Sequence, residues 1–257
     1  MLPLTRRIWR GAHRVIANSQ DLRRLADASL PGLRIDVILN GAATPEPFPV
    51  AVRAPPVGRI LTVSRLIERK GLDTLIRALA RSRDRTLSLD IAGEGPEGTA
   101  LRQLAESCGV ADRVRFHGFV DRAQLASLYA QTEIFALVSC AESCSMAMLE
   151  AMAAGLPIVA TKVGGNVDLV QHQVNGLLVE RENVAALESA LSTLAADPQQ
   201  RRRFGAANRD LVAQRYGWRS VAQRYEAVFR KTVRTPATMA AATDAPLAIL
   251  QRRGIDP

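Results

Sequence analysis

The stretch RILTVSRLIERKGLDTLIRALARSRDRTLSLDIAG, residues 59–93, decides the fold class. It opens with a short apolar run at 59–64, continues through an amphipathic segment at about 71–83, and returns to a second apolar run at 87–93. Strands that are apolar at nearly every position are those buried on both faces, and helices join such parallel strands. The stretch therefore predicts a strand–helix–strand unit of a parallel sheet.

The same alternation continues toward the C-terminus. Strands are predicted at VRFHG (114–118), IFALVS (134–139), PIVAT (157–161) and GLLV (176–179), and helices at about 97–108, 122–131, 145–154 and 166–171. Three further helices are predicted at about 183–196, 198–214 and 218–231. This series is typical of a doubly wound, Rossmann-like α/β domain with helices on both faces of one parallel sheet.

The residues before this domain form a smaller unit. A short strand at 14–19 leads into a helix, and a second strand at 35–39 ends at Asn40-Gly41, a dipeptide that tolerates positive φ and predicts a tight turn. A cluster of prolines then excludes a helix or a central strand. The predicted division is an N-terminal unit at 1–41, a proline-rich linker at 42–57, the α/β domain at 58–232 and a flexible tail at 233–257.

Composition restricts the class of partner. The formal net charge is +9 over 257 residues, and all but three of the 34 basic residues are arginine. That excess fits an anionic partner, and it fits an arginine-rich genome equally well. Nucleic acid is not an expected partner, because aromatic residues are only 4% of the chain and do not interleave with the basic ones.

The cellular compartment follows from the cysteines and the apolar runs. The cysteines Cys108, Cys140 and Cys144 are odd in number and lack metal-ligand spacing, which predicts buried thiols in a reducing, cytoplasmic compartment. No apolar run is long enough to span a membrane, and no secretory signal is evident. The stretch 6–14, with four arginines, predicts either peripheral contact with anionic lipid at the inner face of the membrane or an ordinary solvated helix.

The hexapeptide Gly93-Glu94-Gly95-Pro96-Glu97-Gly98 has the G-x-G-x-x-G form of a dinucleotide fingerprint. In that fingerprint the glycines follow the first strand of the domain, whereas here they follow the second. The acid at about the right distance, Asp112, also precedes its strand instead of ending it. A tight strand-to-helix turn with Pro96 at the helix start is therefore predicted, and NAD(P) binding is the alternative.

Two cations, Arg65 and Lys70 in VSRLIERKG, follow the first strand of the domain. In open α/β sheets ligands bind outside the carboxyl ends of the strands, where these two side chains are predicted to lie. A diphosphate would suit them. The alternative is a solvated charged turn formed with Glu68 and Arg69.

The segment ESCSMAMLEAMAAGLP, residues 142–157, combines an anion site with two acids. Ser145 can cap a helix whose free N–H groups face the same crevice, and helix N-termini bind anions. Glu142 precedes that helix on the loop. Glu150 lies more than one turn inside it among apolar residues, where a carboxylate needs a partner or a ligand hydroxyl. An acid in that place suggests hydrogen bonds to a sugar or a ribose.

Together these motifs resemble the donor-binding half of the family 4 retaining glycosyltransferases, which have the two-domain B-type fold and include enzymes of polysaccharide biosynthesis. The resemblance is carried by the E-x₇-E spacing with LEAMAAGLPIVAT after it, by VSRLIERKGLDTLIRAL, by IAGEGPE, and by VGGNVDLV with NGLLV. It covers about residues 14–231, of which 14–41 are similar to the end of the acceptor domain and the crossover. Several ordered motifs at the family spacing are more specific than any single one.

The resemblance implies a role for each matched residue. Arg65 and Lys70 look like the pair that clamps the donor diphosphate, Glu142 like the carboxylate that contacts the transferred sugar, and Glu150 like the acid that holds the ribose hydroxyls. Backbone N–H groups at the helix start would receive the distal phosphate, and residues after the third strand would border the base. These further donor-binding positions are Ser145, Met146, Ala147, Phe119, Val120 and Gly93. Where the family often has Glu-Gly-Phe-Gly, residues 142–145 are Glu-Ser-Cys-Ser, a departure that bears on the sugar preference.

No metal and no other cofactor is expected. Breaking a sugar–phosphate bond develops charge on the departing diphosphate, and positive charge must already face it. Many nucleotide-sugar enzymes use a divalent ion held by D-x-D, which this sequence lacks, so Arg65, Lys70 and a helix N-terminus are expected to supply that charge. The expected partners are a UDP-, GDP- or ADP-type sugar and a glycan or lipid-linked acceptor.

The resemblance also implies that most of the acceptor domain is missing, and two functions from different classes remain open. One is a glycosyltransferase present as its donor half, which binds a nucleotide diphosphate-sugar but turns over poorly without an acceptor half. The other is a non-catalytic nucleotide-sugar-binding subunit that needs a complementary acceptor-domain chain. Sugar-nucleotide epimerases share the fold but would need their own acids and histidines.

Overall fold

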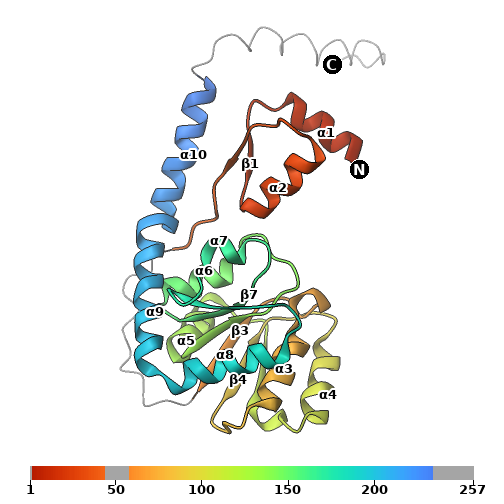
Figure 1. Ribbon diagram of the computed structural model, residues 1–257, viewed down its shortest axis with the longest axis vertical. Helices are drawn as coiled ribbons and strands as arrows, with labels where there is room; N and C mark the ends of the chain where they lie inside the picture. Colours follow the sequence, from red (N-terminus) through yellow and green to blue (C-terminus); the bar gives the residue numbers. More distant parts are fainter. Residues whose placement is uncertain (1, 44–57, 234–257) are drawn as a thin grey trace.

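The computed structural model describes residues 2–43 and 58–233 (Figure 1). Its larger part is a six-stranded parallel sheet with the strand order β5-β4-β3-β6-β7-β8. The strands are β3 (Arg59–Val63), β4 (Ser88–Ala92), β5 (Val114–Gly118), β6 (Ile134–Leu137), β7 (Ile158–Thr161) and β8 (Gly176–Val179). The doubly wound α/β fold predicted from the sequence is confirmed.

Helices cover both faces of this sheet, which explains why its strands are apolar at nearly every position. Successive side chains of a strand point to opposite faces, and the neighbours Ile60 and Leu61 are both fully buried but belong to different hydrophobic clusters. The Ile60 cluster includes residues of α3 (Leu72–Arg81), α4 (Gly98–Ser107) and α8 (Val184–Ala196). The Leu61 cluster includes residues of α5 (Arg122–Gln131) and α6 (Met146–Ala153).

The remaining elements of the larger part are short or C-terminal. They are the 3-10 turns Glu68–Lys70 and Ala111–Arg113, α7 (Asn166–Leu169), α9 (Pro198–Leu211), a π-helical turn at Val212–Tyr216 and α10 (Trp218–Val233). Helix α9 begins as predicted, because Oδ1 of Asp197 accepts the N–H of Gln200 at 2.8 Å and Pro198 occupies the first turn. Within the described ranges, no helix is long and apolar enough to cross a membrane.

The strand order reverses between β3 and β6. From β3 the chain builds outward through β4 and β5, then returns to the other side of β3 to form β6, β7 and β8. Ile60 on β3 is in register with Leu89 on β4 and with Ile134 on β6. The loops that follow β3 and β6 therefore leave the sheet next to each other at its carboxyl edge, the place where open α/β sheets bind ligands.

The N-terminal unit, residues 2–43, contains α1 (Leu2–Gly11), β1 (Val15–Ala17), α2 (Gln20–Ser29) and β2 (Ile35–Val37), with the two strands parallel. Figure 1 shows α10 extending from the six-stranded body toward the end of the molecule where this unit lies. The chain joins the larger body at Ala42, which is fully buried and donates its N–H to the carbonyl oxygen of Tyr216 at 2.8 Å.

Some local predictions are wrong. Neither Asn40 nor Gly41 has a positive φ, so the predicted tight turn is not formed; a Cβ on Gly41 would instead lie 2.7 Å from the Trp218 ring. Pro96 does not begin α4 but lies in the turn before it, because the helix starts at Gly98.

Three predicted elements end earlier than expected. The helices predicted at 198–214 and 166–171 end at 211 and 169, and the strand predicted at 35–39 ends at 37. The proline cluster at 45–56 and the tail beyond 233 lie outside the described residues.

Candidate functional site

A tight ion pair lies at the point where the strand order reverses. Nζ of Lys70, which follows β3, is 2.6 Å from Oε2 of Glu142, which follows β6, and the two side chains are only 14% and 12% exposed. Ser139 donates its hydroxyl to the same carboxylate oxygen at 3.3 Å, and the N–H of Ser143 donates to Oε1 at 3.3 Å. The structure thus brings together two of the predicted site residues and holds the Glu142 carboxylate with three donors.

Helix α6 begins at Met146, four residues after Glu142 of this pair. The hydroxyl of Ser145 accepts the N–H of Met148 at 3.2 Å, so Ser145 is the N-cap as predicted. The N–H groups of Ser145, Met146 and Ala147 donate no hydrogen bond to any described residue. Unpaired N–H groups and the helix dipole make this helix start a site that favours an anion.

Gly165, which follows β7, fixes the position of the Glu142 loop. Its N–H donates to the carbonyl oxygen of Glu142 at 2.9 Å, and a Cβ built on it would lie 1.4 Å from the carbonyl oxygen of Ser143. Only glycine permits that approach. The VGGNVDLV segment carries part of the family resemblance, but no role was predicted for its glycines. A Gly-Gly pair soon after a buried strand is the sequence signal for such a close approach.

Arg65 lies at the same carboxyl edge, two residues beyond β3. Its side chain is exposed and forms no hydrogen bond or ion pair with the described residues. The backbone on either side of it is locked to the turn after β4: the N–H of Leu66 donates to the carbonyl oxygen of Glu94 at 2.9 Å, and a Cβ on Gly93 would lie 1.9 Å from the carbonyl oxygen of Ser64. The guanidinium is therefore exposed to solvent, while the backbone beside it is held in place.

Two glycines of the G-x-G-x-x-G hexapeptide, Gly93 and Gly95, serve close packing of the chain. The spaces that side chains would need at Gly93 and Gly95 are filled by the carbonyl oxygens of Ser64 and Leu66. In a dinucleotide fingerprint the second glycine instead lets the backbone approach the pyrophosphate. The geometry favours the tight-turn interpretation over NAD(P) binding.

Glu150 lies one turn further along α6 and is half-buried. The hydroxyl of Tyr129, on α5, donates to Oε2 of Glu150 at 3.1 Å and also lies 3.1 Å from the carbonyl oxygen of Ala147. Burial first, and the Glu150 charge second, raise the pKa of Tyr129 well above its ordinary value, so the phenol stays protonated and donates. The sequence predicted that this acid needs a partner but did not identify Tyr129, because no local pattern relates α5 to α6.

Phe119 and Val120 lie at the same carboxyl edge of the sheet as Lys70, Glu142 and Glu150. They follow β5, two strands away from β3, and the Phe119 side chain is 77% exposed while Val120 packs partly against the Leu61 cluster. Among the described residues, neither of them forms a hydrogen bond or an ion pair with Lys70, Glu142 or Glu150. Their place is compatible with an exposed rim.

The N-terminal unit touches the loops of this edge directly. Nδ2 of Asn40 donates to the carbonyl oxygen of Cys144 at 3.2 Å, inside the loop that carries Glu142. The N–H of Gln20, at the start of α2, donates to Oδ2 of Asp168 on α7 at 2.8 Å. The larger body and the N-terminal unit thus meet at the edge that carries the ion pair.

The three cysteines are free thiols, as predicted, but the prediction that all three are buried is wrong, because only Cys144 is buried. Cys108 and Cys140 are half-buried, and Cys144 is 6% exposed. Burial raises the pKa of the Cys144 thiol to about 11. Among the described residues, no group of three or more His, Cys, Asp or Glu side chains is placed to hold a metal ion.

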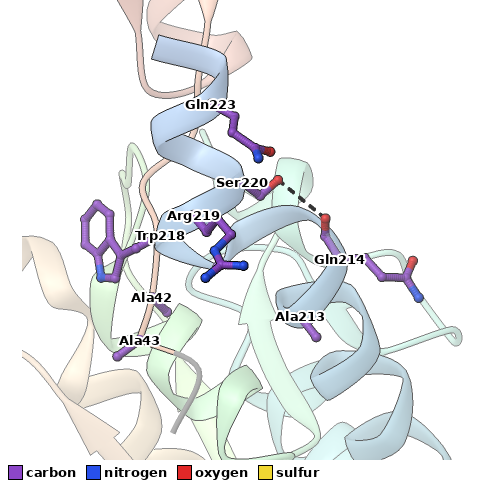
Figure 2. A pocket seen from close by; sticks show the side chains of 9 residues that line it. Ala42, Ala43, Ala213, Gln214, Trp218, Arg219, Ser220 and Gln223 are labelled. Carbon is purple, nitrogen blue, oxygen red and sulfur yellow. Dashed lines mark hydrogen bonds between the residues drawn. The ribbon is translucent and has the colours of Figure 1, made fainter. Parts of the chain in front are cut away.

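A hollow of about 560 Å³ lies elsewhere, where the chain at Ala42 and Ala43 passes the junction of the π-helical turn and α10. Figure 2 shows Trp218, Arg219 and Gln223 among its lining side chains, with the hydroxyl of Ser220 donating to the carbonyl oxygen of Gln214 at 3.5 Å. None of the predicted site residues lines this hollow. Lys70 and Glu142 lie instead at the carboxyl edge of the sheet.

Two curated proteins illustrate the similarity in sequence. The GDP-mannose-dependent alpha-(1-6)-phosphatidylinositol monomannoside mannosyltransferase of Mycobacterium tuberculosis is 37% identical over 175 residues, which are 64% of this chain and 45% of that protein. The D-inositol 3-phosphate glycosyltransferase of Xylanimonas cellulosilytica is 36% identical over 182 residues, 69% of this chain and 43% of that protein. The chain spans a little less than half the length of these relatives.

Solved structures show the same architecture, and a family model agrees. Anabaena HepE in complex with UDP and glucose superposes with a TM-score of 0.77 at 27% identity, covering 89% of this chain and 66% of that one. Sucrose-phosphate synthase from Thermosynechococcus elongatus gives 0.78 at 27% identity, covering 90% and 61%. Residues 53–211, more than half of the chain, match the model of the glycosyl transferases, group 1. The resemblance noted in the sequence is thereby confirmed, and the chain belongs to the group 1 glycosyl transferases.

Proposed function

We propose that this chain forms the donor-binding half of a retaining glycosyltransferase, which moves a sugar from a nucleotide diphosphate-sugar to an acceptor. The observation that carries the proposal is the 2.6 Å contact between Lys70 and Glu142, placed at the strand-order reversal beside the open N-terminus of α6. One cation, one acid and unpaired N–H groups at the same edge suit a ligand with a diphosphate joined to a sugar. The glycosyltransferases among its relatives and the UDP bound to HepE support the same reading.

The diphosphate is assigned to three groups. Lys70 is held in place by Glu142, Arg65 is free to swing onto a ligand, and the N–H groups of Ser145, Met146 and Ala147 face an incoming phosphate. In the reaction, charge grows on the leaving diphosphate as the sugar–phosphate bond breaks, and positive groups already in position stabilise it. Each charge-assisted contact contributes about 1.5 to 3 kcal/mol.

The two acids are assigned to the two sugars of the donor. Glu142, on the loop before α6, would accept hydroxyls of the transferred sugar, and Glu150, one turn inside the helix, would accept those of the ribose. Phe119 and Val120 would border the base, and the Gly93 turn would support the Arg65 backbone under the diphosphate. Along the chain, Glu142 comes first, the start of α6 second and Glu150 third. This order is that of sugar, diphosphate and ribose in the donor.

The proposed transfer uses no metal and no cofactor. The sequence offers no D-x-D pair to hold a divalent ion between the phosphates. Lys70, Arg65 and the dipole of α6 are proposed to supply the positive charge in its place. Transfer that is unchanged by a strong chelator, measured on the chain together with an acceptor half, would support this point, and transfer that requires added Mg²⁺ or Mn²⁺ would contradict it.

The donor is proposed to carry UDP, GDP or ADP. A relative is named as GDP-mannose-dependent, whereas HepE binds UDP, so a thermal-shift screen of UDP, GDP and ADP is the first test. A melting point raised by one of them supports the proposal; no shift with any of the three, confirmed by calorimetry, contradicts it.

A glycan or lipid-linked acceptor is proposed, since a relative acts on a phosphatidylinositol mannoside.

Contact with a membrane surface is a further part of this proposal. On α1 the apolar side chains Leu4 and Ile8 are 65% and 61% exposed, and Arg7 and Arg10 on the same short helix are exposed as well. Such a helix can lie on anionic lipid. Flotation with vesicles that contain phosphatidylglycerol tests it: the chain should float at low salt, and no flotation would contradict the contact.

Release or transfer of the labelled sugar distinguishes the proposed enzyme from the alternative, a non-catalytic nucleotide-sugar-binding subunit. Isotope-labelled nucleotide sugar is incubated with the chain alone and with an acceptor half supplied as a second polypeptide, taken from a related enzyme. The proposed enzyme hydrolyses or transfers the sugar once the acceptor half is present, while the subunit binds the sugar nucleotide in calorimetry without releasing the sugar in either case. Equal, fast transfer with and without the acceptor half would contradict the expected dependence on it.

A further inference from the structure

Tyr129 connects two helices that the sequence does not relate. It lies near the end of α5, its side chain is 3% exposed, and its ring centroid is 6.2 Å from that of Phe135 on β6. Its hydroxyl reaches across to α6, where it meets Oε2 of Glu150 and the carbonyl oxygen of Ala147 at 3.1 Å each. A single buried phenol therefore contacts both the first turn of α6 and the acid one turn inside it.

The contact with Glu150 has a definite direction. A phenol has one proton, and a carboxylate is a stronger acceptor than a backbone carbonyl because it is charged. Donation to Oε2 fixes the rotation of the carboxylate. Oε1 of Glu150 accepts no hydrogen bond from the described residues and is not among their buried, unpartnered polar atoms.

We propose that Tyr129 is the positioning residue for Glu150: its hydroxyl holds one carboxylate oxygen so that the other accepts the ribose hydroxyls of the donor nucleotide. This inference rests on the proposed function, which assigns the ribose to Glu150. A carboxylate that could rotate freely would have to be ordered at each binding event, and that ordering costs affinity. Tyr129 thus sets how strongly the site distinguishes a ribonucleotide from one without ribose hydroxyls.

The competing interpretation is that Tyr129 only packs α5 against α6. Tyr129→Phe separates the two, because it keeps the ring and its contact with Phe135 and removes only the hydroxyl. Tyr216→Phe is the matched control: Tyr216 is also buried, at 6% exposed, and its hydroxyl donates to a backbone carbonyl, that of Asp168, at 3.4 Å. A loss of packing or stability lowers the affinity for all nucleotides alike, whereas a loss of positioning changes their ratio.

The experiment measures dissociation constants by calorimetry for UDP, GDP and ADP and for the 2′,3′-dideoxy form of whichever binds best. The proteins are the full chain and its variants Tyr129→Phe, Glu150→Gln, the double variant and Tyr216→Phe. The unaltered chain is expected to prefer the ribonucleotide by about 10-fold or more, the effect of hydrogen bonds to a charged group. Glu150→Gln should remove most of that preference, Tyr129→Phe should lower it at least about threefold, and Tyr216→Phe should leave it unchanged.

The double variant adds a direct measure of coupling. If Tyr129 acts through Glu150, the double variant has the same preference as Glu150→Gln alone, since the second change has nothing left to act on. The inference is overturned if Tyr129→Phe keeps the full preference, or lowers the affinity for both nucleotides equally, while Glu150→Gln abolishes the preference. The proposed function then still stands. If the unaltered chain binds none of the three diphosphates, the proposed function itself fails and the inference with it.

Discussion

The ammonium nitrogen of Lys70 and Oε2 of Glu142 lie 2.6 Å apart, each on a loop that follows one of two neighbouring strands. The pair is 72 residues apart in sequence and mostly enclosed, so each charge depends on the other for its partner. Arg65, at the same edge, has no partner among the described residues. Because Lys70 is paired and Arg65 is not, replacing Lys70 should change both stability and nucleotide binding, whereas replacing Arg65 should change binding alone.

Replacing Lys70 by alanine should lower both stability and nucleotide affinity. The change leaves the Glu142 carboxylate with only its neutral donors, which should lower the free energy of unfolding by about 1 to 3 kcal/mol, and it removes a charge-assisted contact to the diphosphate. Arg65→Ala is the matched control, since it should weaken nucleotide binding about 10-fold with no change in stability. Urea unfolding and calorimetry measure the two effects. A destabilised Arg65→Ala variant would contradict the assignment.

Glu142→Gln should separate the sugar from the diphosphate. The amide keeps the shape of the acid and removes the negative charge that faces Lys70 and a bound phosphate. A nucleoside diphosphate without a sugar should therefore bind about fivefold more tightly, or ~1 kcal/mol, while sugar transfer in the presence of an acceptor half is lost. Calorimetry with UDP, GDP and ADP checks the first part. Affinity that falls for all three diphosphates would show that Glu142 does not oppose the phosphate.

Gly165→Ala should displace the loop that carries Glu142. The new Cβ would lie 1.4 Å from the carbonyl oxygen of Ser143, so the loop must move, at a cost of about 1 to 3 kcal/mol in unfolding free energy and with loss of nucleotide binding. Gly98→Ala is the control in α4, where the nearest atom to the new Cβ is a flexible side-chain carbon of Leu66 at 3.4 Å. That variant should keep both stability and binding. Unchanged nucleotide affinity in Gly165→Ala would refute the role given to this glycine.

The buried thiol of Cys144 predicts a loss of stability at alkaline pH. Because burial raises its pKa to about 11 in the folded chain, the folded state keeps a proton that the unfolded state loses above pH ~9. The stabilising contribution is thus complete below pH ~9 and is lost as the pH rises toward 11. Urea midpoints at several pH values should fall less steeply in Cys144→Ala than in the unaltered chain. The buried tyrosines act in the same direction but are present in both proteins, so a parallel decline in the two would contradict the prediction.

Most elements of the fold were predictable from local pattern, and the errors have local causes. The apolar runs at 59–64 and 134–139 and the cap at Ser145 were identified because buried strands and helix starts leave short, contiguous signals. Asn40-Gly41 was misread because its composition is that of a turn, while the glycine is there to accommodate the ring of Trp218 from α10. A contact with a distant helix leaves no trace in a dipeptide.

Some residues of the candidate site were predictable from local pattern, and others were not. Lys70, Glu142 and Glu150 were identified from residue type and spacing, together with a family resemblance. Tyr129 was missed because its partner Glu150 lies 21 residues away on another helix, and the faces of two helices that meet are not marked in either sequence segment. Only the packed structure shows that the phenol and the carboxylate meet.

The sequence by itself determined which segments are strands, which are helices, and that Lys70 and Glu142 each follow a strand. Only the tertiary structure decided that β6 returns to pair with β3, past β4 and β5, and so places Lys70 against Glu142. The physical reason is that periodicity reports how one segment is buried, whereas strand order depends on how all segments pack together. Any order of these apolar strands would have left the same local pattern.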